Sequence, residues 1–319
     1  MANIDIPGKY LPWAWAVEPV RGCNLRCGHC TTRLWPPKQY TFMQMDTWCN
    51  ICAIINKTKP KCRVEMANAG EPTLHPDLYK MLSRARKLAP QAQLQITTNG
   101  TQLMSGAVTY KELFRAGANI VYVDMYAANK KHIALAKESG YYFYEYNNKP
   151  PNAPGAWCYH DDPRIKFIVL MTPPIKWPDK RKSLQRLGTF CNSLDWEADK
   201  EFDLVPVTDP PARRCSQLMK YIATNTHGDY MMCCQDLANE TVPIINHNVS
   251  EGVDGFLLFW FGKQMMEWRR LLHFKQRTKI SQCSRCSVIF NKCDMIFWGE
   301  ELHNNYWTGT GWARLPSIV

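Results

Sequence analysis

Short apolar runs alternate with segments whose apolar residues recur at helical spacing through most of the first 200 residues. The runs predict buried strands, and the spaced segments predict helices that cover them. In one such segment, Met43, Trp48, Cys52 and Ile55 fall toward a single helix face. We expect strands over residues 13–20, 62–68, 93–98, 119–126, 141–146 and 164–171, and helices over 41–58, 75–88, 108–116, 130–139 and 180–191.

Repeated strand–helix units imply a parallel sheet or barrel, so the expected fold class is α/β. Barrels of this kind carry their chemistry on the loops that follow the carboxyl ends of the strands. Several polar segments occupy such positions, and their common location is a stronger argument than any one residue. They are the loop that begins at Cys23, the turn Gly70-Glu71-Pro72, the pair Thr98-Asn99, and Asp124.

The pattern changes after about residue 205, where Pro206, Pro210 and Pro211 mark a boundary. We therefore expect one domain over residues 1–205 and a smaller one over 206–319. A segment rich in Pro and Asn over residues 147–163 is long for a loop in a compact domain, and long loops are often functional lids.

Three cysteines, Cys23, Cys27 and Cys30, follow the first expected strand with the spacing C-x3-C-x2-C. This spacing lets three thiolates converge on one metal centre. A cubane iron–sulfur cluster usually takes four Cys thiolates, so three would leave one iron open to a substrate or cofactor, as at an open catalytic zinc site. Two alternatives stay open at this point: a zinc knuckle that lacks its fourth ligand, and three buried free thiols.

The chain has 14 cysteines, which could suggest a secreted disulfide scaffold. However, it is long, starts without a signal peptide and has no apolar stretch long enough to span a bilayer. We therefore expect metal ligation in a reducing cytoplasm, and no membrane partner.

The net charge is +11, and the excess is concentrated between residues 263 and 292. One interpretation is a solvated helix face. A second is a docking surface for an acidic partner such as a small electron-carrier protein. A third is a nucleic-acid surface, because a basic patch is the electrostatic footprint of phosphate binding. No motif of a nucleic-acid-binding module accompanies the charge.

The first half resembles the radical SAM superfamily over roughly residues 13–200. The three cysteines match its signature, and Ala69-Gly70-Glu71-Pro72 resembles its Gly-Gly-Glu-Pro turn, with Ala in the first place. Ile96-Thr97-Thr98-Asn99-Gly100 resembles a strand end that many members carry. His29 departs from the pattern, since members commonly have an aromatic residue before the third Cys, although a His can still pack against the adenine.

The resemblance implies a partial (β/α)6 TIM-like barrel with a 4Fe–4S cluster on the three cysteines. S-adenosylmethionine would chelate the open iron, and reduction would cleave it to methionine and a 5′-deoxyadenosyl radical. The Gly70 turn would offer backbone groups to the methionine amine. Glu71 has an alternative role as a turn-stabilising carboxylate, and Thr98, Asn99 and Asp124 as strand-end caps. The implied cofactor-binding residues are His29, Ala69, Gly70, Glu71, Thr98, Asn99 and Asp124.

The second half resembles the SPASM/Twitch extension, a small α+β domain that holds auxiliary clusters. Cys215, Gly228 and Cys233 resemble its opening, the pair Cys283-x2-Cys286 its later part, and residues 260–272 the helix between them. The shorter Twitch form, with one auxiliary 4Fe–4S cluster, fits best. Its expected ligands are Cys215, Cys233, Cys283 and Cys286, with Cys234 or Cys293 as substitutes and a closed zinc site as the alternative.

We therefore expect a radical SAM enzyme that oxidises or epimerises an unactivated C–H position of an aminosugar, a peptide or a nucleoside. An acidic protein such as flavodoxin or ferredoxin would supply electrons. An epimerisation needs a hydrogen donor, often a thiol, for which Cys158, Cys191 and Cys234 are the candidates; each is otherwise an inert buried Cys. The rival hypotheses are a radical SAM enzyme that modifies nucleic acid or its nucleotides, and a non-catalytic zinc-binding interaction protein.

Overall fold

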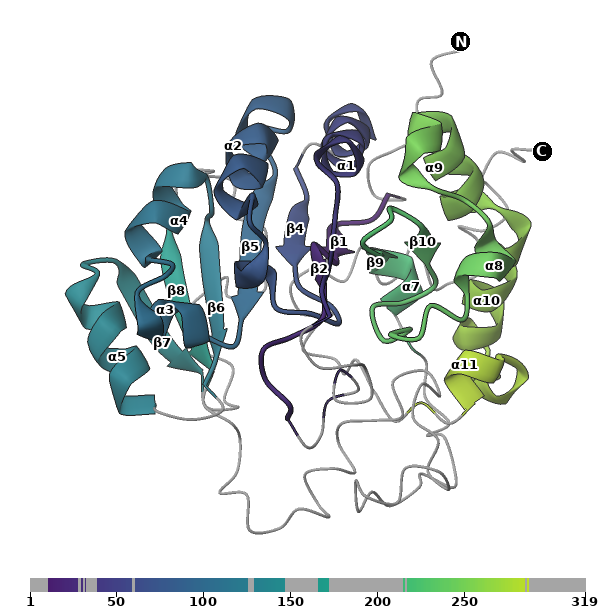
Figure 1. Cartoon of the computed structure of the whole chain (residues 1–319). Helices are drawn as coiled ribbons and strands as arrows, with labels where there is room; N and C mark the ends of the chain where they lie inside the picture. The colour runs from purple at the N-terminus through teal and green to yellow at the C-terminus, as the bar shows by residue number, and fades with distance from the viewer. Residues whose placement is uncertain are drawn as a thin grey trace.

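An eight-stranded sheet that is parallel except at one edge organises the fold (Figure 1). The computed structural model of the chain describes residues 11–27, 30, 32, 39–58, 61–125, 129–146, 166–171, 215, 217–284 and 286. The strands of this sheet are β1 (Ala14–Val17), β4 (Arg63–Met66), β5 (Gln93–Thr98), β6 (Ile120–Asp124), β7 (Tyr142–Tyr146), β8 (Phe167–Met171), β9 (Tyr221–Thr224) and β10 (Tyr230–Met231).

The strands β1, β4, β5 and β6 lie side by side in chain order, each parallel to the next. Strand–helix–strand repeats produce this arrangement, because each helix carries the chain back over the sheet before the next parallel strand begins. The expected α/β fold, with a partial TIM-like barrel as its core, is therefore confirmed.

The far edge of the sheet departs from chain order, since β8 lies between β6 and β7. The first four residues of β8 are apolar and buried, whereas Tyr142 of β7 is 66% exposed. A continuous apolar strand is favoured where both faces of a sheet are covered, and a more polar strand tolerates an edge. Their composition thus explains why the later strand takes the inner position.

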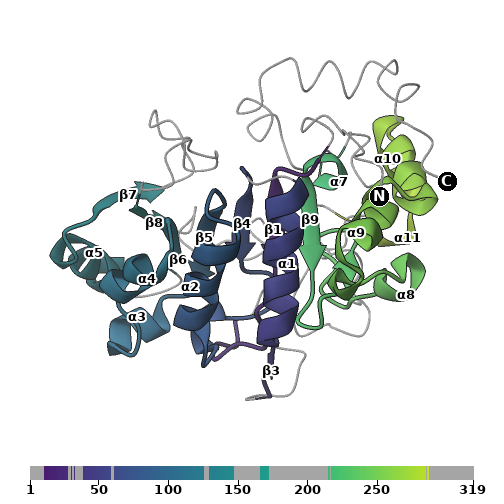
Figure 2. The same cartoon turned by 90° about the horizontal axis from the view of Figure 1, so that it is seen from above.

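One face of the sheet carries a row of helices (Figures 1 and 2). Alternate strand residues such as Trp15, Val64 and Ile96 join these helices in the main core, because successive side chains of a strand point to opposite faces. The indole nitrogen of Trp48 also donates to the carbonyl of Met81, at 2.7 Å, and so joins the first two helices. The helices are α1 (Met45–Thr58), α2 (Leu78–Leu88), α3 (Thr101–Ser105), α4 (Tyr110–Ala116) and α5 (Asn129–Glu138).

The first expected strand and the helix after it have different bounds in the structure. The strand breaks at Pro19, which lacks the amide proton that a ladder needs, and resumes as β2 (Val20–Arg21). Strand β2 pairs antiparallel with β3 (Thr41–Phe42). The prediction that a helix starts at Thr41 was therefore wrong: α1 begins at Met45, because the preceding residues form this small second sheet.

The helix expected over residues 260–272 is two helices, α9 (Gly252–Phe261) and α10 (Lys263–His273). Gly262 separates them in an extended conformation, with φ −63° and ψ 154°. A side chain at this position would overlap the carbonyl of Leu258, which a glycine avoids. Spacing alone did not reveal this break, because apolar residues continue at helical intervals across it.

The second half of the chain adds to the core sheet. Strand β9 pairs in parallel with β1, and Ala16 lies opposite Ala223. The boundary expected at residue 205 stays a prediction. The remaining short helices here are α7 (Gln217–Lys220), α8 (Val242–Ile245), η5 (Val249–Glu251), η6 (Arg277–Lys279) and α11 (Ser281–Ser284).

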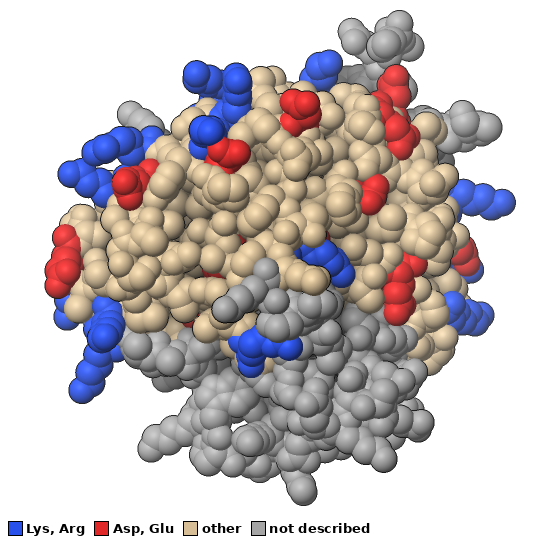
Figure 3. Space-filling model, viewed as in Figure 1, with Lys and Arg blue, Asp and Glu red and all other residues tan. Residues whose placement is uncertain are grey.

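The basic run that starts at Lys263 does not form one solvated surface. Arg269 and Arg277 are only 3% and 2% exposed. Lys263, Lys275 and Lys279 are exposed, as a docking surface would require. On the face seen in Figure 3, Lys and Arg side chains lie mostly toward the rim, with acidic side chains among them.

Several expectations lie outside the described residues. They include the helix over 180–191, the whole loop over 147–163, and the residues His29, Cys158, Cys191 and Cys293. Within the described part of the chain, no helix combines the length and apolarity that crossing a membrane requires.

We predict that the buried Arg269 contributes far more to stability than its neighbour Arg270. The Arg269 guanidinium lies 3.9 Å over the Trp260 ring and donates to the carbonyl of Leu218 at 2.9 Å. Arg269→Gln should lower the free energy of unfolding by about 2–4 kcal/mol, because carbonyls that it satisfies lose their donor.

Arg270→Gln is the matched control, since Arg270 is exposed and, among the described residues, its side chain pairs only with Glu267 across one helical turn. It should leave the urea unfolding curve nearly unchanged. Equal losses in the two variants would contradict this account of the basic run.

Candidate metal centres

The three-cysteine loop meets the ends of β4 and β5 at one edge of the sheet. Gly22, next to Cys23, forms a bridge with Gly70 in the turn after β4. The backbone amide of Glu71 donates to the carbonyl of Gly22 at 2.9 Å. The loop is thereby held against the turn that the sequence associates with it.

Cys23, Cys27 and Cys30 are half-buried and interact electrostatically with one another. Burial, together with the charges of the other two thiols, raises the pKa of the Cys27 thiol to about 11. Burial also raises the pKa of Cys23. These are values for metal-free thiols, and a coordinating metal deprotonates such groups.

Asn99 links the three-cysteine loop to the end of β5. Its amide nitrogen donates to the sulfur of Cys23 at 3.4 Å and to the side-chain oxygen of Asn24 at 2.9 Å. Its own side-chain oxygen accepts from the amide and hydroxyl of Thr101. Asn99 therefore ties the end of β5 to the start of α3 and contacts a predicted cluster ligand, while its expected contact with S-adenosylmethionine stays a prediction.

Glu71 is fully buried, and its carboxylate accepts four hydrogen bonds from the protein. One oxygen accepts from the amide and hydroxyl of Thr73 and from the hydroxyl of Thr98, and the other accepts from the amide of Asn99. Burial raises its pKa, and these donors lower it. The contacts favour the turn-stabilising role of Glu71, in which it caps the short helix η3 (Pro72–Leu74).

Gly70 has a steric reason to be glycine that differs from the one inferred from the sequence. A side chain at this position would overlap the carbonyl oxygen of Val20 and crowd that of Gly22. Close approach to another backbone segment is a common use of glycine. This tight contact is made within the protein, between β2 and the turn, and the expected contact of the turn with the methionine amine stays a prediction.

Asp124 ends β6 on the same side as the three cysteines. Its charge raises the pKa of the Cys27 thiol slightly, so the two groups lie near each other. Ala69 is 3% exposed and precedes the Gly70 turn. The structure thus gathers Ala69, Gly70, Glu71, Thr98, Asn99 and Asp124 around the first set of cysteines.

A second set of cysteines, Cys215, Cys233, Cys283 and Cys286, comes together from distant parts of the sequence. All four are buried, with exposed fractions of 5–8%. Cys283 interacts electrostatically with each of the other three, and burial raises its pKa well above the usual value. Burial likewise raises the pKa of Cys215 to about 12.

Local hydrogen bonds fix the segments that carry these thiols. The carboxylate of Asp236 accepts from the amides of Glu240 and Thr241 and from the Thr241 hydroxyl, which closes the loop after Cys233. The amide of Cys286 donates to the carbonyl of Cys283 at 3.2 Å. A backbone hydrogen bond therefore joins the two residues of the C-x2-C pair, and both residues are buried.

The chemistry of both donor sets fits iron–sulfur clusters. Among the described residues, no group of three or more His, Cys, Asp or Glu is arranged to hold a single metal ion. Thiolates of a four-iron cluster bind different irons, so they are spread more widely than ligands of one ion. The first set offers three thiols and the second offers four, which are the numbers expected for one open and one closed cluster.

Other cysteines differ in their surroundings. Cys234 accepts a hydrogen bond from the side-chain amide of Gln217 at 3.3 Å and packs on the side of the sheet that carries Ala16 and Ala223. Its contact with Cys233 raises its pKa well above the usual value. Cys52 is 2% exposed in the main core, as expected for a packing residue.

Glu18 is a buried acid that the sequence reading missed. It is 1% exposed at the end of β1, 3.6 Å from the guanidinium of Arg21, and accepts from the amide of Thr226. Burial raises its pKa from 4.5 to about 7, although Arg21 opposes this. Its position in the otherwise apolar segment over residues 13–20, expected to be a buried strand, could have identified it as a buried acid.

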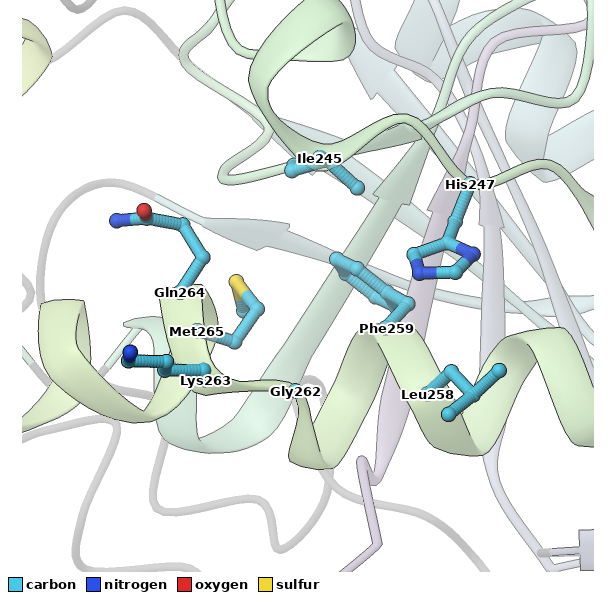
Figure 4. A pocket seen from close by; sticks show the side chains of 8 residues that line it. All are labelled: Ile245, His247, Leu258, Phe259, Gly262, Lys263, Gln264 and Met265. Carbon is cyan, nitrogen blue, oxygen red and sulfur yellow. The ribbon is translucent and has the colours of Figure 1, made fainter. Parts of the chain in front are cut away.

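A cavity of about 210 Å³ lies away from both cysteine sets, between α8, α9 and the start of α10 (Figure 4). Ile245, Leu258, Phe259 and Met265 form most of its apolar wall, and His247 and Lys263 lie at its rim. It contains none of the site residues expected from the sequence.

Comparison with known proteins finds sequence similarity for the first half of the chain. Residues 17–147 match the Radical SAM superfamily. The chain is 32% identical over 109 residues to the tungsten-containing aldehyde ferredoxin oxidoreductase cofactor-modifying protein of Pyrococcus furiosus, covering 34% of this chain and 29% of that protein. It is 29% identical over 114 residues to the GTP 3′,8-cyclase of Xanthomonas axonopodis pv. citri, covering 33% and 32%. These matches span about a third of each relative's length.

A solved structure extends the likeness in fold to most of the chain. BtrN in complex with AdoMet and 2-DOIA superimposes with a TM-score of 0.62 at 18% identity, and the match covers 86% of this chain and 93% of BtrN. The open conformation of BtrN gives a TM-score of 0.54. At this identity the likeness concerns the fold.

We predict that Gly70→Ala displaces the three-cysteine loop, because the added carbon would overlap the Val20 carbonyl. The variant should bind less iron at the first site and unfold at a lower temperature. Gly106→Ala is the control. The φ of +77° at Gly106 would strain the backbone of an alanine, but no atom lies close enough to overlap with the added carbon. This variant should cost only about 1 kcal/mol and retain its iron; similar iron loss in both variants would argue against the steric account.

We predict that Glu18 makes stability depend on pH. Its folded-state pKa is raised, so the protonated carboxyl adds to the free energy of unfolding. This contribution is fully present below pH 4.5 and is lost as pH rises through about 7. The loss amounts to roughly 3 kcal/mol at most. Glu18→Gln should therefore be more stable than the wild type at pH 8 and similar at pH 4.5, as measured by urea unfolding. A constant difference across this range would contradict the prediction.

Proposed function

We propose that this chain, whose residues 17–147 match the Radical SAM superfamily, is a radical SAM enzyme that uses S-adenosylmethionine and a 4Fe–4S cluster held by Cys23, Cys27 and Cys30. The observation that carries the proposal is the junction of the three-cysteine loop with two strand ends. Gly22 pairs with Gly70, and Asn99 donates to Cys23. The loop is thus fixed beside the residues that would contact the cofactor.

A reduced cluster held by Cys23, Cys27 and Cys30 would supply the electron for the cleavage of S-adenosylmethionine, and so the radical chemistry that removes a hydrogen atom from a substrate. The protein has to orient the cofactor and exclude water. The backbone of the Gly70 turn would bind the methionine amine, and Thr98, Asn99 and Asp124 would contact the carboxylate or ribose. His29 would pack against the adenine. Glu71 would act indirectly, by holding the turn against Thr98.

We propose that Cys215, Cys233, Cys283 and Cys286 hold one auxiliary 4Fe–4S cluster of the Twitch type, with residues 206–319 as its domain. The burial and mutual electrostatic contacts of the four thiols support this assignment. A cluster with four protein ligands has no open iron, so its suitable role is to pass electrons. An oxidation needs such an outlet, because a substrate radical must lose an electron as well as a proton.

The proposed reaction is the oxidation or epimerisation of an unactivated C–H position in an aminosugar, a peptide or a nucleoside. The fold shared with BtrN, which was solved with AdoMet and 2-DOIA, supports a small-molecule substrate. Oxidation is favoured by the closed second site. An epimerisation would instead require a thiol donor, for which Cys234 is the described candidate and Cys158 and Cys191 the others.

An acidic electron carrier such as flavodoxin or ferredoxin is the proposed reductant, in a cytoplasmic setting. Exposed Lys263, Lys275 and Lys279 supply complementary charge. The same residues are the basis of the rival proposal that the enzyme modifies nucleic acid. Phosphate contacts release counterions, so that rival requires duplex binding that weakens steeply with salt.

We predict that Cys27→Ala abolishes the release of 5′-deoxyadenosine from S-adenosylmethionine in the presence of dithionite, because the first cluster loses a ligand. Cys49→Ala is the matched control, since Cys49 is a half-buried thiol on α1. It should retain release near the wild-type rate. Persistent release by the Cys27 variant would show that the cluster assignment is wrong.

The substrate class can be tested with deuterated candidates. Transfer of deuterium from an aminosugar, peptide or nucleoside into 5′-deoxyadenosine would identify both the substrate and the abstracted position. Absence of transfer from every member of the three classes, with release of 5′-deoxyadenosine intact, would refute the proposed substrates and leave the enzyme class standing.

A further inference from the structure

We infer that Arg277 is a positioning residue of the four-cysteine site, which sets the reduction potential of the auxiliary cluster. The inference rests on the proposed function, because it requires that an auxiliary cluster is present. In the sequence, Arg277 looks like one more member of the basic run. The structure buries it to 2% exposure, in the interior beside the thiols.

Two kinds of contact tie Arg277 to this site. Its guanidinium donates to the carbonyl oxygen of Cys286 at 3.0 Å, between residues nine apart in the chain. It also interacts electrostatically with Cys215 and Cys283, so it lies near residues from two different segments of this site. Arg277 begins η6, and the chain runs from there directly into α11 and the C-x2-C turn.

A buried guanidinium is costly unless an anion or several acceptors compensate for its lost hydration. Thiols are neutral, but four thiolates on an iron–sulfur core make an anion. The hydrogen bond to the carbonyl of Cys286 holds the guanidinium beside this site. A permanent cation in this position would complement the negative charge of a cluster held by the four cysteines.

Charge at this position has a redox consequence. Reduction adds one negative charge to the cluster, and a nearby cation in a medium of low dielectric constant favours the more negative state. Cluster potentials respond to such charges and to hydrogen bonds. Arg277 should therefore raise the potential of the auxiliary cluster and make it a better acceptor of the electron that an oxidation releases.

The test is an EPR-monitored redox titration of the anaerobically purified full-length chain. A Cys27→Ala background removes the signal of the first cluster. Arg277→Gln should shift the midpoint to more negative potential by at least 59 mV, which is tenfold in the equilibrium constant of a one-electron couple. Arg277→Lys keeps the charge and should shift it much less. Lys279→Gln removes an exposed charge from the same short helix and should leave it unchanged.

An unchanged midpoint in Arg277→Gln, or equal shifts in the Gln and Lys variants, would overturn the inference while the auxiliary cluster itself stands. If Arg277→Gln loses the cluster, retention of the cluster by Arg277→Lys supports a charge requirement, and loss in both variants opposes it. Wild-type protein without a second iron cluster would refute the proposed auxiliary site as well, and metal analysis of the same samples separates that result from the others.

Discussion

The buried carboxylate of Glu71 is the contact on which the first site depends. It holds Thr73 within its own turn and Thr98 and Asn99 at the end of the neighbouring strand. Asn99 then reaches the sulfur of Cys23. A buried carboxylate with missing donors costs several kcal/mol, so these groups are arranged together or not at all. The three-cysteine loop therefore rests on a rigid support.

One sheet relates the two cysteine sets to each other. Strand β1 leads into β2 and the three-cysteine loop, and its other neighbour β9 belongs to the segment between Cys215 and Cys233. Parallel strands place their carboxyl ends on the same edge, whereas β10 runs antiparallel and returns Cys233 toward the opposite end. This pairing gives a physical reason why an electron outlet can be held at a fixed position relative to the first cluster.

The sequence predicted the repeated strand–helix units and the closely spaced cysteine motifs. The strand over residues 93–98 was predicted with both ends correct, and the strand–helix alternation indicated the parallel core. It could not show contacts between distant segments. Thr41–Phe42 is a strand because β2 lies opposite it, and Arg277 is buried beside the four-cysteine site, where it donates to the carbonyl of Cys286. Glu18 was likewise hidden, since its pKa depends on Arg21, Thr226 and the packing around them. The charge and spacing of residues along the chain do not reveal such contacts between distant segments.

The central claim is that the chain builds two separate cysteine sites, one open and one closed. Metal analysis of anaerobically purified protein tests it most directly, because two four-iron clusters give about eight irons per chain. Replacing either cysteine set by alanine should leave about four irons. Only the protein that retains Cys23, Cys27 and Cys30 should change its EPR spectrum when S-adenosylmethionine is added. Zinc without iron, or a response to S-adenosylmethionine from the four-cysteine site alone, would contradict the account.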